Sequence, residues 1–68
     1  MTEREKILRA RNLIQAFFNG NDQKRVAWFN APNLSLSGLS PNEMIARGRI
    51  DKLLLYIEGA LHENKTHN

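Results

Sequence analysis

Hydrophobic residues recur every three or four positions over the first third of the chain, which is the spacing of one face of an α-helix. They are Ile7, Ala10, Leu13, Ile14, Phe17 and Phe18. Thr2 and Glu5 have the spacing of a capping box, in which each side chain accepts a hydrogen bond from the other residue's backbone N–H. Gly20 ends the pattern, because glycine readily adopts the left-handed conformation that follows a helix. The sequence therefore predicts a first helix between Thr2 and Gly20.

A second, shorter helix is expected to start at Asn21 or Asp22, since both side chains are good N-caps. Pro32 ends this helix, because proline lacks the backbone N–H and restricts the residue before it. The buried side of this helix is expected to consist of Val26, Ala27 and either Trp28 or Phe29.

Leucine and serine alternate after Pro32, which resembles a short strand, but the chain offers no partner strand. We therefore predict an ordered loop over residues 33–39 that places Leu36, and either Leu34 or Leu39, in the core. Trp28 and the Leu36–Gly38 segment are expected to hold the second and third helices together.

Ser40-Pro41-x-Glu43 is the clearest helix start in the chain. Ser40 caps, Pro41 occupies the first helical position, where its missing N–H costs nothing, and Glu43 completes a capping box. The third helix is expected to turn Met44 and Ile45 inward and to end at Gly48.

The fourth helix is predicted to bury Ile50, Leu53, Leu54, Ile57 and Leu61. The apolar residues from Leu53 to Ile57 are consecutive, so some of them must point away from the core. The segment 62–68 is polar and is expected to be a disordered tail. The predicted fold is all-α: a compact single-domain bundle of about four short helices over residues 1–61.

Length and composition limit the chain to one small domain of 68 residues. It has no cysteine, which excludes disulfides and cysteine-ligated zinc. No apolar run approaches the roughly 18–20 residues of a membrane-spanning helix, and the N-terminus lacks the apolar region of a secretory signal. We therefore expect a cytoplasmic protein.

Candidate catalytic and metal-binding residues are sparse. His62 and His67 lie five positions apart in the polar tail, which does not place two ligands on one helix face. The acidic residues mostly lie at helix starts, where capping explains them, and the four glycines are too dispersed to form a phosphate-binding loop. The sequence predicts no enzyme activity, no cofactor, no metal and no catalytic residue.

The chain is basic, with ten Lys and Arg against seven Asp and Glu and a net charge of +3. The alternative function is therefore a small nucleic-acid-binding regulator, such as one encoded by a mobile element. Its binding would depend on Arg4, Arg9, Arg11 and Arg49. The basic residues are scattered along the sequence, however, which favours a solvated surface over a dedicated nucleic-acid site.

An ordered set of motifs at fixed spacing spans the middle of the chain: Ala27-Trp28-Phe29, Pro32-Asn33, Leu36-Ser37-Gly38 and Ser40-Pro41-x-Glu43-Met44. This set, with Ile57-Glu58-Gly59 downstream, resembles the C-terminal toxin-binding domain of Xre/MbcA/ParS-type antitoxins, which are often paired with RES-fold toxins. The resemblance extends from about Val26 to Gly59, and its motif residues are Trp28, Pro32, Asn33, Gly38, Ser40, Pro41 and Glu43.

The resemblance implies a protein-binding module that neutralises a toxin by occluding its active site, and it allows a homodimer. It places the contact surface on the last helix, at Tyr56, Glu58, Gly59, Ala60 and Leu61, with Arg47 and Arg49 as a charged rim. Gly59 has two interpretations: it loosens or ends the helix, or it lets a partner's backbone approach closely.

Members of this family usually carry a helix-turn-helix domain ahead of the toxin-binding domain. The residues before Val26 are too few for such a domain, so repression of an operon through DNA is not carried over to this chain. Met1 favours a free-standing toxin-binding domain, while an excised domain or a reused scaffold with another partner stays open. The polar segment from His62 is a further departure from the family.

Overall fold

A computed structural model describes residues 1–66, with side chains described up to His62. Over this range the chain forms four α-helices and one short 3₁₀ helix, and no strand. The elements are α1 (Glu3–Phe17), α2 (Asp22–Asn30), η1 (Leu34–Leu36), α3 (Pro41–Ala46) and α4 (Ile50–Thr66). The predicted all-α, four-helix fold is confirmed.

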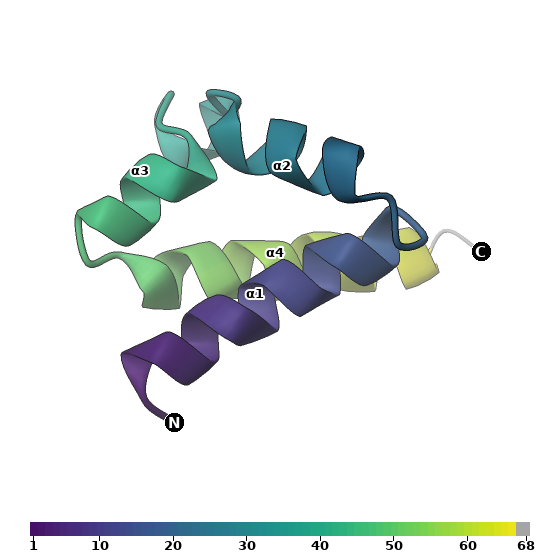
Figure 1. The fold of residues 1–68 in the computed structure, drawn as a ribbon, viewed down its shortest axis with the longest axis horizontal. Coiled ribbons are helices and arrows are strands. Elements are labelled where there is room, and N and C mark those ends of the chain that lie inside the picture. The colour runs from purple at the N-terminus through teal and green to yellow at the C-terminus, as the bar shows by residue number, and fades with distance from the viewer. Residues whose placement is uncertain (67–68) are drawn as a thin grey trace.

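The two long helices, α1 and α4, lie side by side and run in roughly the same direction (Figure 1). The shorter α2 and α3 run back over them and return the chain from the end of α1 to the start of α4. Two ion pairs connect the long helices on the outside: Lys6 Nζ lies 2.6 Å from Asp51, and Arg9 Nη2 lies 2.8 Å from Glu58. The result is a two-helix layer that is covered by a single row of short helices.

The core lies between these layers. Its buried side chains are Ala10, Ile14, Phe29, Leu36, Met44, Ile50, Leu53 and Ile57. Leu53 and Ile57 are among the largest fully buried residues, and they lie one turn apart on the face of α4 that meets the other helices. Each helix and η1 contributes at least one of these side chains, so the hydrophobic effect holds all the elements in one cluster.

Local signals in the sequence set the helix starts as expected. Thr2 with Glu5, and Ser40 with Glu43, form complete capping boxes at the starts of α1 and α3. Asn21 rather than Asp22 caps α2, its side chain accepting a hydrogen bond of 3.0 Å from the Lys24 N–H.

The buried side of α2 differs from the prediction. Phe29 is buried and Trp28 half-buried, but Val26 is 46% exposed and Ala27 is exposed as well. The physical reason is that α2 is short and packs mainly against α1 and α3, so only one residue of its inward face is buried. Val26 lies one turn before Phe29, at the edge of that face.

The segment after Pro32, predicted as an ordered loop, contains the short 3₁₀ helix η1. Leu36 is buried and Leu39 partly buried, whereas Leu34 is 96% exposed, so Leu39 is the second leucine directed to the core. The Asn33 side chain caps η1 by accepting from the Ser35 N–H. Gly38 then adopts a φ of +80°, a left-handed conformation that glycine tolerates best.

The fourth helix is longer than the sequence predicted. It continues past Leu61 to Thr66, so residues 62–66 of the expected disordered tail are helical; residues 67 and 68 lie outside the described part. Gly59 does not end the helix either. Polar residues extend a helix readily when no proline or left-handed residue interrupts it, because each added residue gains a backbone hydrogen bond.

Candidate protein-binding groove

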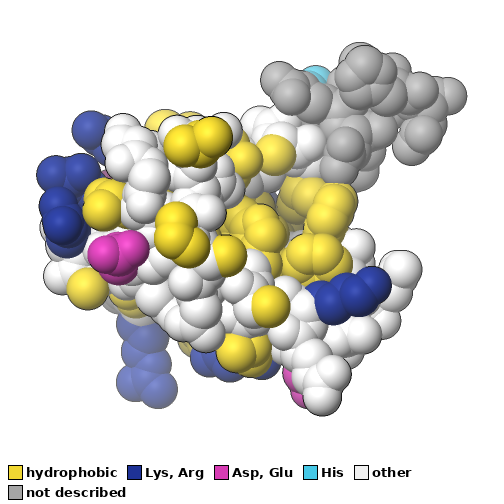
Figure 2. All heavy atoms as spheres, turned by 90° about the horizontal axis from the view of Figure 1, so that it is seen from above, with side chains coloured by type: hydrophobic (Ala, Val, Ile, Leu, Met, Phe, Trp, Pro, Cys, Tyr) yellow, Lys and Arg dark blue, Asp and Glu magenta, His cyan; other side chains and the backbone are white. Residues whose placement is uncertain are grey.

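An apolar groove lies between the C-terminal part of α1, one side of α2 and the middle of α4. It has a volume of about 160 Å³ and is lined by Ile14, Phe17, Trp28, Tyr56, Ile57, Ala60 and Leu61. The space-filling view shows a hollow with hydrophobic walls (Figure 2). No charged side chain lines the groove among the residues that the structure describes.

Helical spacing brings these side chains together. Tyr56 and Ala60 are four residues apart on α4, so they lie one above the other, and the small Ala60 leaves room beside the tyrosine ring. From α2, Trp28 forms one wall; its indole is half-buried and meets the Phe29 ring edge to face, with centroids 5.1 Å apart. The walls are thus aromatic on two sides.

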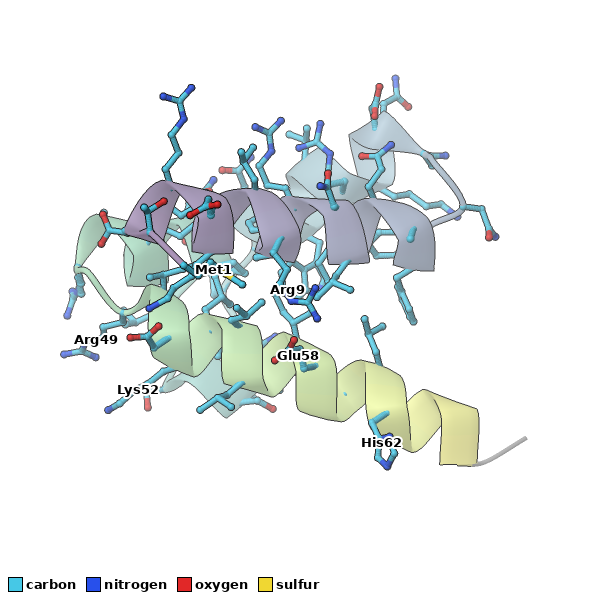
Figure 3. The ribbon with its side chains drawn as sticks, turned by 90° about the horizontal axis from the view of Figure 1, so that it is seen from below. Met1, Arg9, Arg49, Lys52, Glu58 and His62 are labelled. Carbon is cyan, nitrogen blue, oxygen red and sulfur yellow. The ribbon has the colours of Figure 1, made fainter. Side chains whose placement is uncertain are left out.

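The partner-binding residues expected from the sequence divide into two groups. Tyr56, Ala60 and Leu61 lie together in the groove. Glu58 instead faces α1, where its carboxylate accepts hydrogen bonds of 3.0 and 2.8 Å from Arg9 (Figure 3). Gly59 is exposed outside the groove.

Arg47 and Arg49 lie in the turn between α3 and α4, at the opposite end of α4 from the groove. Figure 3 shows Arg49 and His62 at the two ends of this helix. The two arginines therefore do not form a rim around Tyr56, Ala60 and Leu61.

Sequence reasoning did not assign Phe17 to the groove. It placed Trp28 in the structural motif and also among the apolar residues in excess of one inward stripe, which an exposed partner-binding patch would explain. Phe17 was expected in the core, but it is 47% exposed at the mouth of the groove. A weak signal existed at Trp28-Phe29: adjacent residues point about 100° apart on a helix, so both cannot face the same core.

The remaining motif residues build the connection between α2 and α3. Ser40 and Pro41 are buried, and the Ser40 hydroxyl accepts a 3.1 Å hydrogen bond from the Glu43 N–H. Asn33 closes the η1 segment, because its carbonyl accepts from Gly38 and its N–H donates to Leu39. These residues position Trp28 and Phe29 without lining the groove themselves.

Two carboxylates have perturbed acidities, and helix capping explains both. The backbone N–H of Thr2, and then its hydroxyl, lower the pKa of Glu5 against a small opposing desolvation. The same two groups of Ser40, with a further contribution from the charge of Arg47, lower the pKa of Glu43. Carboxylates of this kind stay ionised near neutral pH and serve as acceptors rather than as proton donors.

Comparisons with protein-family models, with curated proteins and with solved structures found no match. Among the described residues, whose side chains extend to His62, no group of three or more His, Cys, Asp or Glu side chains is placed to hold a metal ion. Over the same part of the chain, no helix has the length and apolar character needed to cross a membrane. The apolar groove is the surface feature that most needs a functional explanation.

Proposed function

We propose that this chain is a protein-binding module of the antitoxin type. In this proposal it docks on a partner protein through the apolar groove and occludes the partner's active site. The partner suggested by the sequence resemblance is a RES-fold toxin. The observation that carries the proposal is the groove between α1, α2 and α4, with Trp28 and Tyr56 on its walls.

The size of the groove supports one kind of occupant. An apolar cavity of about 150 Å³ accommodates a benzene ring, and the groove has a volume of about 160 Å³. It therefore suits one leucine or aromatic side chain from a partner segment. Tryptophan and tyrosine are also the residues most often found at the energetic centre of protein interfaces.

The charge distribution favours a protein partner over nucleic acid. Carboxylates of the described residues engage Lys6 and Arg9 at 2.6 and 2.8 Å. On the face that Figure 2 shows, Lys and Arg side chains lie at separate places rather than in one stripe that could follow a phosphate backbone.

Two matched variants on α4 test the groove. Ala60→Arg fills it with a charged side chain and removes no core contact, because Ala60 is half-exposed on its wall. Leu55→Arg adds the same charge to the same helix at a position that is 71% exposed and outside the groove. Circular dichroism should show the same helicity for both variants and the unchanged chain.

The tagged chain and both variants would be purified from the organism that encodes the chain, with a high-salt wash that is collected and analysed for nucleic acid. We expect a stoichiometric protein partner with the unchanged chain and with Leu55→Arg, and loss of that partner with Ala60→Arg. A RES-fold partner supports the antitoxin role. A partner of another fold overturns that role but still supports the groove as the docking site. Equal binding by all three chains shows that the groove is not the docking site. Salt-released nucleic acid as the only product favours the alternative function, a nucleic-acid-binding regulator.

A further inference from the structure

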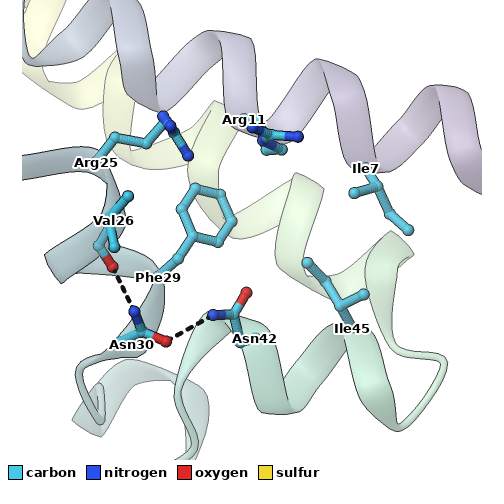
Figure 4. A pocket seen from close by; sticks show the side chains of 8 residues that line it. All are labelled: Ile7, Arg11, Arg25, Val26, Phe29, Asn30, Asn42 and Ile45. Atoms are coloured by element: carbon cyan, nitrogen blue, oxygen red, sulfur yellow. Dashed lines mark hydrogen bonds between the residues drawn. The ribbon is translucent and has the colours of Figure 1, made fainter. Parts of the chain in front are cut away.

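A second hollow lies on the other flank of α2, between α1, α2 and α3. It has a volume of about 330 Å³. Figure 4 shows Arg11 and Arg25 along one side, the Phe29 ring at its centre, and Asn30 and Asn42 on the opposite side. No acidic side chain lines it among the described residues, although two guanidinium groups do.

The Arg25 guanidinium is held in a fixed position. Its side chain is only 17% exposed, and Nε donates a 2.5 Å hydrogen bond to the side-chain oxygen Oε1 of Gln15. Gln15 is fixed in turn because its amide donates to Asp22 at 2.6 Å. The nearest carboxylate oxygen, on Asp22, lies 3.9 Å from Arg25 Nη2, which is too far for a hydrogen bond. The terminal N–H groups of Arg25 are therefore available to a ligand.

Arg11 supplies a second cation at the same hollow. It lies on the exposed side of α1, and no carboxylate of the described residues forms an ion pair with it. Two guanidinium groups beside one cavity repel each other, and an anion between them removes this repulsion and forms charge-assisted hydrogen bonds.

The opposite side of the hollow is polar but uncharged. Asn42 donates a 2.8 Å hydrogen bond to Asn30, and Asn30 donates a 3.0 Å hydrogen bond to the Val26 carbonyl. The hydrogen bond to Asn30 occupies one N–H of the Asn42 side-chain amide, and the side-chain oxygen of Asn42 is left as an acceptor. In Figure 4 that oxygen points into the hollow, toward the side that carries the arginines. A backbone N–H of a bound peptide is a suitable donor for it.

We infer that this hollow binds an acidic side chain of a protein partner, with an adjacent apolar side chain of the same segment packed on Val26. The arginines recognise the carboxylate, and the apolar wall recognises its neighbour. Nucleic acid fits less well, because the Phe29 ring is 4% exposed and offers no free face for base stacking. The inference rests on the proposed function only in taking the partner to be a protein.

The test uses small peptides and therefore does not depend on finding the partner. Acetyl-Leu-Glu-N-methylamide would be titrated into the ¹⁵N-labelled chain and followed by NMR, with acetyl-Leu-Gln-N-methylamide as its uncharged counterpart. We expect saturable shifts at the Arg25 Nε–H and at the side-chain amide of Asn42. Replacing Glu by Gln should weaken binding by roughly tenfold, the equivalent of one charge-assisted hydrogen bond.

Arg11→Gln should weaken binding of the Glu peptide to a similar extent. Arg4→Gln is its matched control, because Arg4 is exposed on the same helix and does not line the hollow, while the net charge changes equally. Equal losses in the two variants, or equal affinity for the two peptides, overturn the inference. Inorganic phosphate binding as tightly as the Glu peptide overturns it as well, since the apolar wall then contributes nothing. Each of these results leaves the Ala60 test of the groove unaffected.

Discussion

Gly59 is the position at which a single methyl group distinguishes a structural from a functional role. It lies within α4 in a helical conformation, and a Cβ placed there meets no atom within 4 Å. Gly59→Ala therefore causes no clash and removes only the entropy cost of holding glycine in a helix. We expect the free energy of unfolding to rise by about 0.5–1 kcal/mol.

This increase is measurable in so small a domain. A change of 1 kcal/mol shifts Tm by roughly 4–8 °C in a 60–100-residue domain, so Gly59→Ala should raise Tm by about 2–8 °C. Thermal unfolding followed by circular dichroism at 222 nm, with urea titration as a second measure, provides the assay. An unchanged or lowered Tm would refute the conclusion that Gly59 lies in a regular, unobstructed helix.

Gly48→Ala is the matched control, because the same methyl group should have the opposite effect there. Gly48 connects α3 to α4 with a φ of +73°, and space around it is equally open. An alanine in the left-handed region costs roughly 1–2 kcal/mol, so Tm should fall. A Gly59→Ala chain that is more stable but loses its partner would show that Gly59 allows a backbone to approach closely. Retention of the partner would assign Gly59 no role in binding.

Two further predictions concern the core and the helix caps. Leu53 is fully buried, so Leu53→Ala should lower the free energy of unfolding by about 2–5 kcal/mol. A domain of this size has a free energy of unfolding of roughly 3–10 kcal/mol, so we expect a much lower urea midpoint. A loss below about 1 kcal/mol would contradict the packing described. The second prediction concerns pH. The pKa values of Glu5 and Glu43 are lowered in the folded state. Their contribution to stability is therefore present above the ordinary glutamate pKa and is lost as the pH falls through the pKa values of the folded state. Urea titrations from pH 7 to pH 2.5 should show a smaller acid-induced loss of stability for a Glu5→Gln/Glu43→Gln chain than for the unchanged chain. An equal loss in the two chains would contradict the role of these carboxylates.

Local sequence signals predicted the helices well, since their causes are local. A capping box involves residues three apart, as at Thr2 and Glu5, and a left-handed glycine such as Gly48 needs no distant partner. The errors arose where burial depends on a distant element. The alternation of Leu34, Leu36 and Leu39 does not reveal which leucines face the core until α2 and α3 are in place.

The groove could be predicted only in part, for the same reason. Tyr56 and Ala60 share a helix face by their spacing, so a contact surface on α4 follows from the sequence. That Phe17 and Trp28 complete it depends on how α1 and α2 cross α4, which no local pattern specifies. The grouping of Arg47 with these residues came from the resemblance alone, and the length of α4 separates them.

Both proposed sites follow from one property of the fold. A single row of two short helices, nine residues in α2 and six in α3, covers a layer that is two long helices wide. One helix is about 10 Å in diameter, so this row leaves apolar surface uncovered on either flank. Trp28 and Phe29, adjacent on α2, border the groove and the arginine-lined hollow respectively. A partner segment that crosses α2 could therefore place a leucine or aromatic side chain on one flank and a carboxylate on the other. Ala60 and Arg11 each line only one of these hollows, so variants at these positions measure the two contributions separately.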